Sequence, residues 1–138
     1  MAAKDLFHNA VKQGLIKDDW VITEDPLKIK IEGVKFEIDL AAQKVIAAQK
    51  AEQKIAVEIK SFLNNSAITD FHGALGQFLN YRLALQISES DRILYLAIPV
   101  DTFESFFQEK FTQEAVSFYQ VKLLVYDPVK EVIIKWKN

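Results

Sequence analysis

The sequence predicts one α/β domain with a mixed central sheet, in the order helix, three strands, helix, strand, helix and two strands. Three stretches, 4–16, 70–86 and 101–107, repeat apolar residues every three or four positions, as helices with one buried face do. The segments between them alternate apolar and polar residues, as half-buried strands do. With 138 residues, half of them hydrophobic, the chain can bury one core but scarcely two, so residues 1–138 are predicted to form a single domain.

The first helix is predicted from Lys4 to Ile16, because its apolar residues recur at helical spacing. They are Leu6, Phe7, Ala10, Val11 and Leu15. The segments KDDW and EDP that follow are predicted as turns, since Pro26 disfavours helix in the residue before it. LKIKI and KFEIDL then alternate as two strands of a hairpin, with Glu32 and Gly33 at the reversal. This pattern puts Asp39 on the polar face of the second strand.

The stretch AAQKVIAAQKAEQK, residues 41–54, fits two structures. Its Ala, Gln and Lys content favours a helix, whereas the alternation around Val45 favours a strand and a second hairpin, which we expect here. KIAVEIKSF follows as the strand predicted to lie at the centre of the sheet. Ile55, Val57 and Ile59 form its apolar face, so Glu58 and Lys60 share the opposite face.

A second helix is predicted to end near Gln86, with Thr69 or Asp70 as its cap. Its core stripe comprises Phe71, Ala74, Leu75, Phe78 and Leu79. RILYLAIP then predicts a mostly apolar strand. Asp101 and Glu104 have capping-box spacing, which predicts a short amphipathic helix through residue 107. VKLLVYD and EVIIKW are the last two strands, joined by a turn at residues 128–130.

Composition narrows the classes of function. Cysteine is absent and the first residues lack a basic and then apolar signal, which favours a reducing cytoplasm. No apolar run approaches the ~18 residues that a membrane helix needs. The net charge of −2 leaves no global footprint for nucleic acid. Two sets of lysines, Lys28/Lys30/Lys35 and Lys44/Lys50/Lys54, either form a local nucleic-acid patch or protect strand edges; we favour edge protection.

Asp39 and Glu58 are candidate metal ligands, because sheet pairing can bring two polar strand faces together. Two converging carboxylates repel, and a divalent ion such as Mg²⁺ or Mn²⁺ supplies the missing charge. Lys60 would then lie beside the ion and stabilise developing negative charge. His8 becomes a Mn²⁺ ligand if the first helix packs near both carboxylates. The alternative is that Glu58 and Lys60 form a solvated pair on a half-exposed strand.

Gly73, Gln77 and Tyr81 fall at four-residue steps and so form one stripe of the second helix. Gln77 is a two-way hydrogen bonder, and Tyr81 offers a hydroxyl and a ring, which suit a nucleotide or its phosphate. Gly73 and Gly76 each weaken the helix, which suggests a close backbone approach. The alternative is that Gln77 faces water and Tyr81 packs partly on the sheet.

Taken together, these residues resemble the PD-(D/E)XK nuclease superfamily. The matching elements, in chain order, are His8, Asp39, Glu58-Ile59-Lys60 and Gln77-Phe78-Leu79-Asn80-Tyr81. The helix histidine and the QxxxY spacing are similar to the RecB-type exonuclease branch. The resemblance implies a restriction-endonuclease-like core with Gln77 and Tyr81 on the substrate side.

The same resemblance implies a role for each residue of the cluster. Asp39, Glu58 and the Ile59 carbonyl correspond to the metal ligands, His8 to an extra ligand, and Lys60 to the catalytic lysine. The implied reaction is hydrolysis of a phosphodiester with Mg²⁺ or Mn²⁺. Asp39 departs from the superfamily pattern in lacking a preceding proline.

The chain as a whole is similar to the XisH family. The likeness runs through KDLFHNAVKQ, EIDLAAQKVIAAQK, KIAVEIKSF, ALGQFLNYR and KLLVYDP. It implies control of fdxN element excision from DNA in heterocyst-forming cyanobacteria, alongside a small XisI partner and a separate site-specific recombinase. The alternative to a nuclease is a non-catalytic interaction module on the same scaffold. That alternative predicts an exposed apolar patch made of Phe103, Phe106, Phe107 and Phe111.

Overall fold

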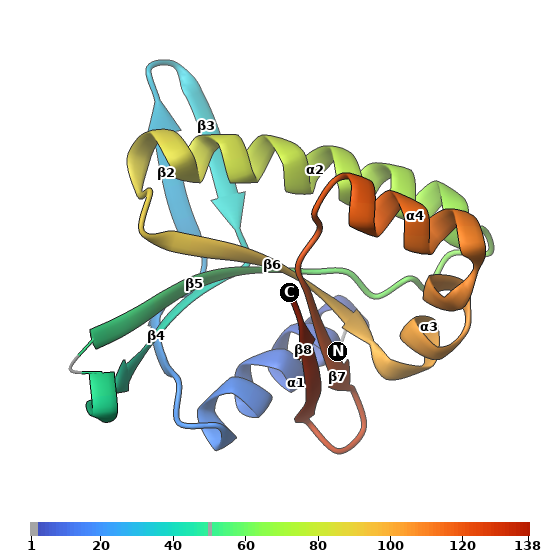
Figure 1. The fold of residues 1–138 in the computed structure, drawn as a ribbon, viewed down its shortest axis with the longest axis horizontal. Coiled ribbons are helices and arrows are strands. Elements are labelled where there is room, and N and C mark those ends of the chain that lie inside the picture. Colours follow the sequence, from blue (N-terminus) through green and yellow to red (C-terminus); the bar gives the residue numbers. More distant parts are fainter. Residues whose placement is uncertain (1–2, 50) are drawn as a thin grey trace.

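The computed structural model describes residues 3–49 and 51–138, which form four α-helices and eight strands (Figure 1). The helices are α1 (Ala3–Lys17), α2 (Ala67–Ser88), α3 (Val100–Glu104) and α4 (Lys110–Phe118). The strands are β1 (Val21–Glu24), β2 (Leu27–Ile31), β3 (Val34–Ile38), β4 (Leu40–Ile46), β5 (Ala51–Ile59), β6 (Arg92–Pro99), β7 (Leu123–Asp127) and β8 (Val132–Lys137). Within the described part of the chain, no helix is both long and apolar enough to cross a membrane.

Six strands form the main sheet in the order β1-β4-β5-β6-β7-β8. β5 and β7 run parallel to β6, whereas the other neighbouring pairs are antiparallel, so the predicted mixed sheet is confirmed. β5 lies inside the sheet between β4 and β6, as its apolar sequence predicts. The ambiguous stretch 41–54 is a strand pair, with a short 3-10 turn at Ala47–Gln49.

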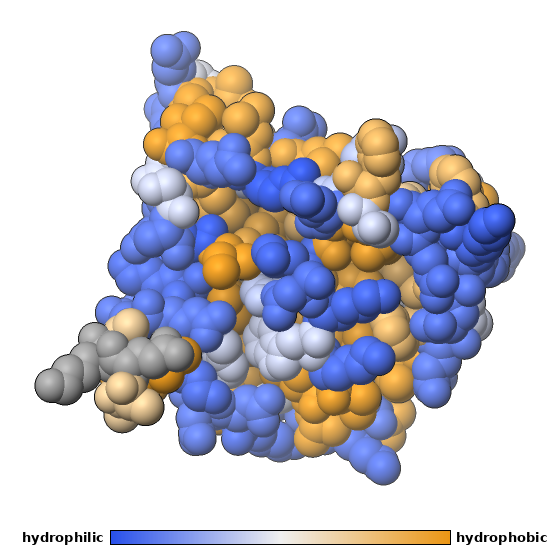
Figure 2. Space-filling view, viewed as in Figure 1, coloured by the Kyte–Doolittle hydropathy of each residue, from blue (hydrophilic) through white to orange (hydrophobic). Residues whose placement is uncertain are grey.

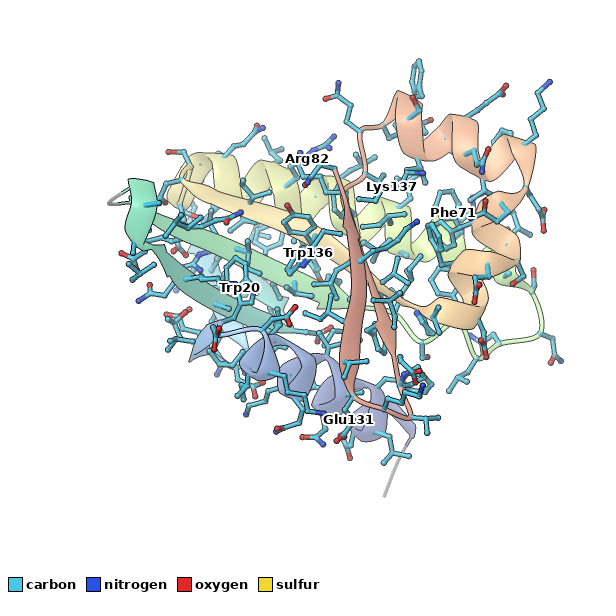
Figure 3. The ribbon with its side chains drawn as sticks, turned by 60° about the horizontal axis from the view of Figure 1, so that its bottom comes forward. Trp20, Phe71, Arg82, Glu131, Trp136 and Lys137 are labelled. Atoms are coloured by element: carbon cyan, nitrogen blue, oxygen red, sulfur yellow. The ribbon has the colours of Figure 1, made fainter. Side chains whose placement is uncertain are left out.

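Helices cover both faces of the main sheet and enclose two cores (Figure 1). On the α1 face, Ile55 and Val57 pack with Trp20, which stacks on Trp136 at 5.6 Å between ring centroids (Figure 3). On the opposite face, Phe71 of α2 meets phenylalanines that lie beyond α3. Because side chains alternate along β5, Glu58 points away from the α1 core and toward the side of α2.

β2 and β3 form a separate hairpin that packs against α2. Its buried residues, Leu27, Ile29 and Ile38, face the core. Lys30 and Lys35 lie opposite each other on the exposed face. Figure 2 shows apolar surface where this hairpin meets the C-terminal half of α2, which carries the exposed Leu83.

The other lysine set mostly serves local pairing. Lys44 donates to the Asp18 carbonyl, and Lys54 pairs with Asp91 at 3.3 Å. β4 and β5, which carry these two lysines, are interior strands of the main sheet, so the contacts do not bear on the edge-protection interpretation, which stays a prediction. Lys50 lies outside the described residues.

Five strands, not three, separate α1 from α2, and this corrects the predicted order. No strand was predicted between the turns KDDW and EDP, where β1 lies. It is a four-residue edge strand whose mostly exposed side chains give no alternation to detect. KFEIDL is not one strand either, because the chain bends at Asp39 and passes from the small sheet to the main sheet. Asp39 therefore lies at a junction rather than on a strand face.

The predicted caps of the later helices are wrong. The N-cap of α2 is Ser66, whose Oγ accepts from the Thr69 N–H at 3.3 Å, while Asp70 accepts from Asn64 in the preceding loop. α3 begins after Pro99 without a side-chain cap. It ends at residue 104, because Ser105 hydrogen-bonds to carbonyls of the last turn, and α4 follows as a separate helix.

The glycine with a close neighbour is in α1, not in α2. A Cβ on Gly14 would lie 3.2 Å from Ile133 of β8, whereas one on Gly73 or Gly76 would meet no atom within 4 Å. The predicted close backbone approach at Gly73 and Gly76 is therefore wrong for atoms of this chain. Gly14 instead allows α1 to pack directly on the last strand.

Candidate functional site

Asp39 and Glu58 meet through reciprocal hydrogen bonds. The Asp39 N–H donates to Glu58 Oε1 at 3.3 Å, and the Ile59 N–H donates to Asp39 Oδ2 at 2.8 Å. The junction between β3 and β4 thus lies against the C-terminal end of β5. Each carboxylate is held by the backbone next to the other, so the two side chains are fixed before any ligand arrives.

Lys60 completes this cluster, which we call the carboxylate cluster: Asp39, Glu58 and Lys60. The Lys60 ammonium lies 3.6 Å from Glu58 Oε2. The Lys60 N–H donates to the Ala97 carbonyl at 3.0 Å, which ties its backbone to β6. Lys60 remains partly exposed while Glu58 is buried, so the ammonium borders the solvent side of a buried carboxyl.

Burial dominates the electrostatics of Glu58. Loss of water, and after it the charge of Asp39, raise the pKa of Glu58 to about 8, although Lys60 opposes the shift. Glu58 is 5% exposed, a low value for a carboxyl side chain without a full counter-charge. Ionisation of Glu58 is therefore unfavourable by itself, and a nearby cation would favour the ionised form.

The donor atoms of this cluster fit a hard divalent ion. Such ions take carboxylate and carbonyl oxygens, which Asp39, Glu58 and the Ile59 carbonyl supply. Among the described residues, no hydrogen bond occupies Asp39 Oδ1. Within that same part of the chain, no three His, Asp or Glu side chains are placed to hold one ion. The fit therefore rests on two carboxylates and a backbone oxygen.

His8 lies near the cluster but has another partner. It lines a small cavity of about 40 Å³ together with Asp39 and Ile59. Its Nε2 lies 2.7 Å from Asp25 Oδ1, and Lys12 binds the second oxygen of that carboxylate. Burial disfavours ionised Asp25, yet Lys12 and His8 hold the pKa of this carboxyl below its usual range. The ring is thus positioned by Asp25 at the edge of the cluster.

Gln77 and Tyr81 face the same region from α2. Gln77 and Gly73 line a cavity of about 470 Å³ together with Lys60. Tyr81 packs edge-on against Phe36 of β3, with 6.3 Å between ring centroids. Burial raises the pKa of Tyr81, and the carboxylates, Glu58 first, raise it further. The structure thus brings both α2 residues to the carboxylate cluster.

Several residues of that cavity were not predicted from the sequence. Ser61, Phe62, Asn64 and Asp70 also line it, from the loop after β5 and the first turn of α2. The Asn64 side chain donates to Asp70 Oδ1 at 2.8 Å, which fixes the rim. The available signal was position for Ser61 and Phe62, which directly follow the Glu58-Ile59-Lys60 triplet.

The chain is similar to known proteins over nearly its whole length. The family model described as XisH protein matches residues 1–134. The crystal structure of an XisH family protein from Nostoc punctiforme has a TM-score of 0.88 and 49% identity; the match covers 97% of this chain and 100% of that chain.

A second crystal structure is that of an fdxN element excision controlling factor protein from Anabaena variabilis. Its TM-score is 0.88 and its identity 52%, and the match covers 97% of this chain and 99% of that chain. No curated protein matches the chain. Since the family model spans nearly the whole sequence and both structures share about half of its residues, the chain belongs to the XisH family.

Proposed function

We propose that this chain is a controlling factor for excision of a DNA element. We further propose that it hydrolyses phosphodiesters with a divalent metal on a restriction-endonuclease-like (PD-(D/E)XK) core. The observation that carries the proposal is the reciprocal clamp of Asp39 and Glu58 with Lys60 beside it. The description of the Anabaena variabilis protein as an fdxN element excision controlling factor supports the biological role.

The path of the chain supports the proposed core. β4 and β5 pair antiparallel, α2 crosses over the sheet, and β6 returns parallel to β5. This path puts Asp39 before one strand and Glu58 at the end of the next. Both carboxylates thus lie at strand ends and are held by main-chain hydrogen bonds. Sites built on such rigid elements keep their geometry more precisely than sites on loops.

Each residue of the cluster has a separate role in the proposed reaction. Asp39, Glu58 and the Ile59 carbonyl would hold Mg²⁺ or Mn²⁺, and the bound ion would supply positive charge to polarise a phosphate. Lys60 places a second positive charge at the solvent-facing side, where charge develops on the phosphate during hydrolysis. Partial burial keeps that charge effective, because water screens it less than at an open surface.

Gln77 and Tyr81 bind and orient the substrate in this proposal. Both come from α2, whose side chains line the cavity above Lys60 or contact β3. The Gln77 amide can donate to a phosphate oxygen, and the Tyr81 hydroxyl can do the same because its raised pKa keeps it protonated. His8 is proposed as an additional metal contact once Asp25 releases its ring.

Thermal unfolding with and without millimolar Mn²⁺ tests the metal site. An ion at about 100 times its dissociation constant adds ~2.7 kcal/mol to the free energy of unfolding. This equals several degrees of melting temperature for a domain of this size. We expect the wild type to gain this increment and Asp39→Ala to lose it.

Asp101→Ala is the matched control, because Asp101 is an exposed carboxylate on α3, outside the carboxylate cluster. It should respond to Mn²⁺ as the wild type does. An equal response in Asp39→Ala would place the ion elsewhere and contradict the proposed ligands. Lys60→Gln should keep the Mn²⁺ increment but lose DNA cleavage, which separates metal binding from catalysis.

Cleavage of duplex DNA should be assayed with the chain alone and with a XisI-like partner and the site-specific recombinase. The net charge of −2 favours a requirement for the partner, since phosphate contacts come from lysine and arginine. If Mn²⁺ stabilises the protein but DNA is cleaved under none of these conditions, the proposed metal site is supported and the proposed nuclease activity is contradicted.

A non-catalytic role with a XisI-like partner is the second candidate. The predicted patch of four phenylalanines does not form, because Phe103, Phe106 and Phe107 are buried in the α2 core. A different observation favours docking: Phe111 and Phe118 are 64% and 80% exposed and lie two helical turns apart on α4. In this case Phe118→Ser should weaken partner binding and leave the Mn²⁺ increment unchanged.

A further inference from the structure

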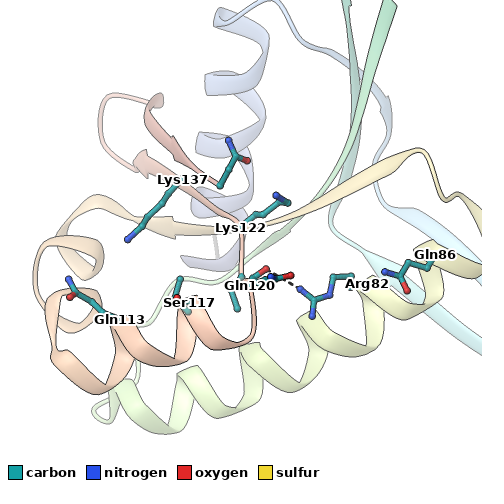
Figure 4. A pocket seen from close by; sticks show the side chains of 10 residues that line it. Arg82, Gln86, Gln113, Ser117, Gln120, Lys122 and Lys137 are labelled. Atoms are coloured by element: carbon teal, nitrogen blue, oxygen red, sulfur yellow. Dashed lines mark hydrogen bonds between the residues drawn. The ribbon is translucent and has the colours of Figure 1, made fainter.

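A cleft of about 640 Å³ lies between α2, α4 and the last two strands (Figure 4). Its cations come from three separate elements: Arg82 from α2, Lys122 from the segment before β7, and Lys137 from β8. Side-chain amides and one hydroxyl line the rest of its polar wall. We call it the basic cleft. Its volume is in the range of small-ligand sites.

All the charged side chains that line the basic cleft are positive. No Asp or Glu side chain lines it. Among the ion pairs of residues 3–49 and 51–138, none involves Arg82, Lys122 or Lys137. The three cations thus line one cleft with no acidic side chain among them, in a chain whose net charge is −2. Like charges placed together repel, so an anion would lower the energy of the arrangement.

Arg82 is held in place by the end of α4. Its Nη1 donates to the Tyr119 and Gln120 carbonyls at 2.9 and 3.0 Å, and its guanidinium lies 5.3 Å from the centre of the Phe78 ring. No hydrogen bond within the described part of the chain uses its Nη2 or Nε. The guanidinium is therefore oriented by the fold and still has N–H donors for a ligand.

A second cavity of about 170 Å³ extends the basic cleft. It shares Arg82, Gln86 and Lys122 with the larger one, and no acidic side chain lines it. Its additional arginine, Arg92, is committed to Glu89 and to the Ile55 carbonyl. The basic cleft therefore continues along α2 into a cavity that is also free of acidic side chains.

We propose that the basic cleft binds a phosphate group, carried by a nucleic acid or by a free nucleotide. Phosphate offers several oxygens at once, which suits an oriented guanidinium, two lysines and surrounding amide donors better than a single carboxylate does. The two lysines act as point charges, and Arg82 supplies directional donors. Gln86 and Gln113 supply neutral donors on either side of the cleft.

This site is separate from the carboxylate cluster and does not rest on the proposed hydrolysis. The residues that line it are different from those lining the cavity above Lys60. Gln77 and Tyr81 lie on one stripe of α2, and Arg82 and Gln86 form another, about 100° around the helix. The same helix thus serves both sites. Phosphate binding in the basic cleft needs no divalent ion.

The test measures binding in EDTA, with a labelled DNA duplex of about 20 base pairs, AMP and inorganic phosphate as probes. Lys122→Gln with Lys137→Gln removes two charges of the cleft. The hydrogen bonds of Arg82 to the end of α4 stay in place. Lys17→Gln with Lys130→Gln is the matched control, since these lysines are exposed, lie outside both cavities and remove the same charge. Melting temperatures confirm that both double variants stay folded.

For duplex DNA we expect the cleft variant to bind on the order of tenfold more weakly, and its slope of log K against log salt to fall by about two. Loss of AMP or phosphate binding with unchanged duplex binding would also support the proposal, with a free nucleotide as the source. Three results would overturn it: no binding of any probe by the wild type, unchanged binding of all probes in the cleft variant, or equal losses in the control.

Discussion

The carboxylate cluster and the basic cleft each contain several charged groups, but those groups differ in their exposure to water. In the cluster, Glu58 is buried, and the Asp39 N–H and the Lys60 ammonium contact its carboxyl group. In the cleft, Lys137 is exposed and Lys122 partly so, and water screens their mutual repulsion. The charged groups of the cluster therefore destabilise the folded state strongly, whereas those of the cleft do so only slightly.

This difference separates stability from binding. Changes in the cluster should alter the free energy of unfolding even without ligand, because buried polar groups lose partners. Changes to the lysines of the cleft should act almost entirely on ligand affinity. Arg82 is intermediate, since it contributes to the cleft and also binds the carbonyls at the end of α4.

The largest expected effect is the pH dependence of stability due to Glu58. Its pKa is about 8 in the folded protein against a usual value of 4.5, so between these values the folded state holds a proton that the unfolded chain releases. The free energy of unfolding should therefore fall as pH rises through this window, by up to ~3–5 kcal/mol. Urea unfolding without divalent ions, at about pH 5 and about pH 8.5, measures it.

Glu58→Gln stays neutral and should lose most of this dependence, so that it exceeds the wild type in stability at the higher pH. Mn²⁺ should flatten the wild-type profile by favouring the ionised carboxyl. Parallel profiles for the two proteins would show that Glu58 is not the titrating group.

The next effect concerns Asp39. At about pH 6, Asp39→Ala leaves the partly buried Ile59 N–H without its acceptor, which should cost ~1–3 kcal/mol. Lys122→Gln, in the basic cleft, should stay within about 0.5 kcal/mol of the wild type. Chemical denaturation of both variants compares the two regions directly, and similar losses would remove the distinction between them.

Arg82→Gln should have a smaller effect on stability than Asp39→Ala. It removes two hydrogen bonds from an arginine to the carbonyls that end α4, which we expect to cost about 1 kcal/mol at this partly exposed position. Hydrogen exchange should show the loss first at the C-terminal turn of α4. A loss spread evenly over the sheet would contradict this local role.

The smallest effect is a gain. Gly73→Ala introduces a methyl group into open space on α2, which should stabilise the helix by ~0.5–1 kcal/mol. Gly76→Ala is the matched control, because Gly76 is equally open but does not line the cavity above Lys60. If substrate enters that cavity, DNA cleavage should fall in Gly73→Ala and persist in Gly76→Ala. Equal cleavage would place the substrate elsewhere.

Much of the fold follows from local patterns. The alternation in KIAVEIKSF assigned Ile55 and Val57 to one face and Glu58 to the other, as the structure confirms. β6 and the last strand pair were equally readable, because the side-chain period of a strand is a property of the segment itself. β1 was missed because a short exposed edge strand leaves no such period.

The composition of the candidate site could be read from the sequence, but its geometry could not. The sequence brought Asp39, Glu58 and Lys60 together as a group and offered Gln77 and Tyr81 as neighbours. It placed Asp39 on a strand face, whereas the chain bends there between two sheets. Such a bend depends on where each flanking strand finds its partner, and pairing is decided by contacts between distant segments.

The sequence by itself determined the residue types, the strand faces and the family of this protein. Only the tertiary structure decided which polar groups meet. Arg82, Lys122 and Lys137 are far apart in the chain, and they share one cleft because parallel β5, β6 and β7 are joined through helices that cross the sheet. Crossover connections bring distant residues together by burying apolar faces, and that driving force does not depend on the polar residues it juxtaposes.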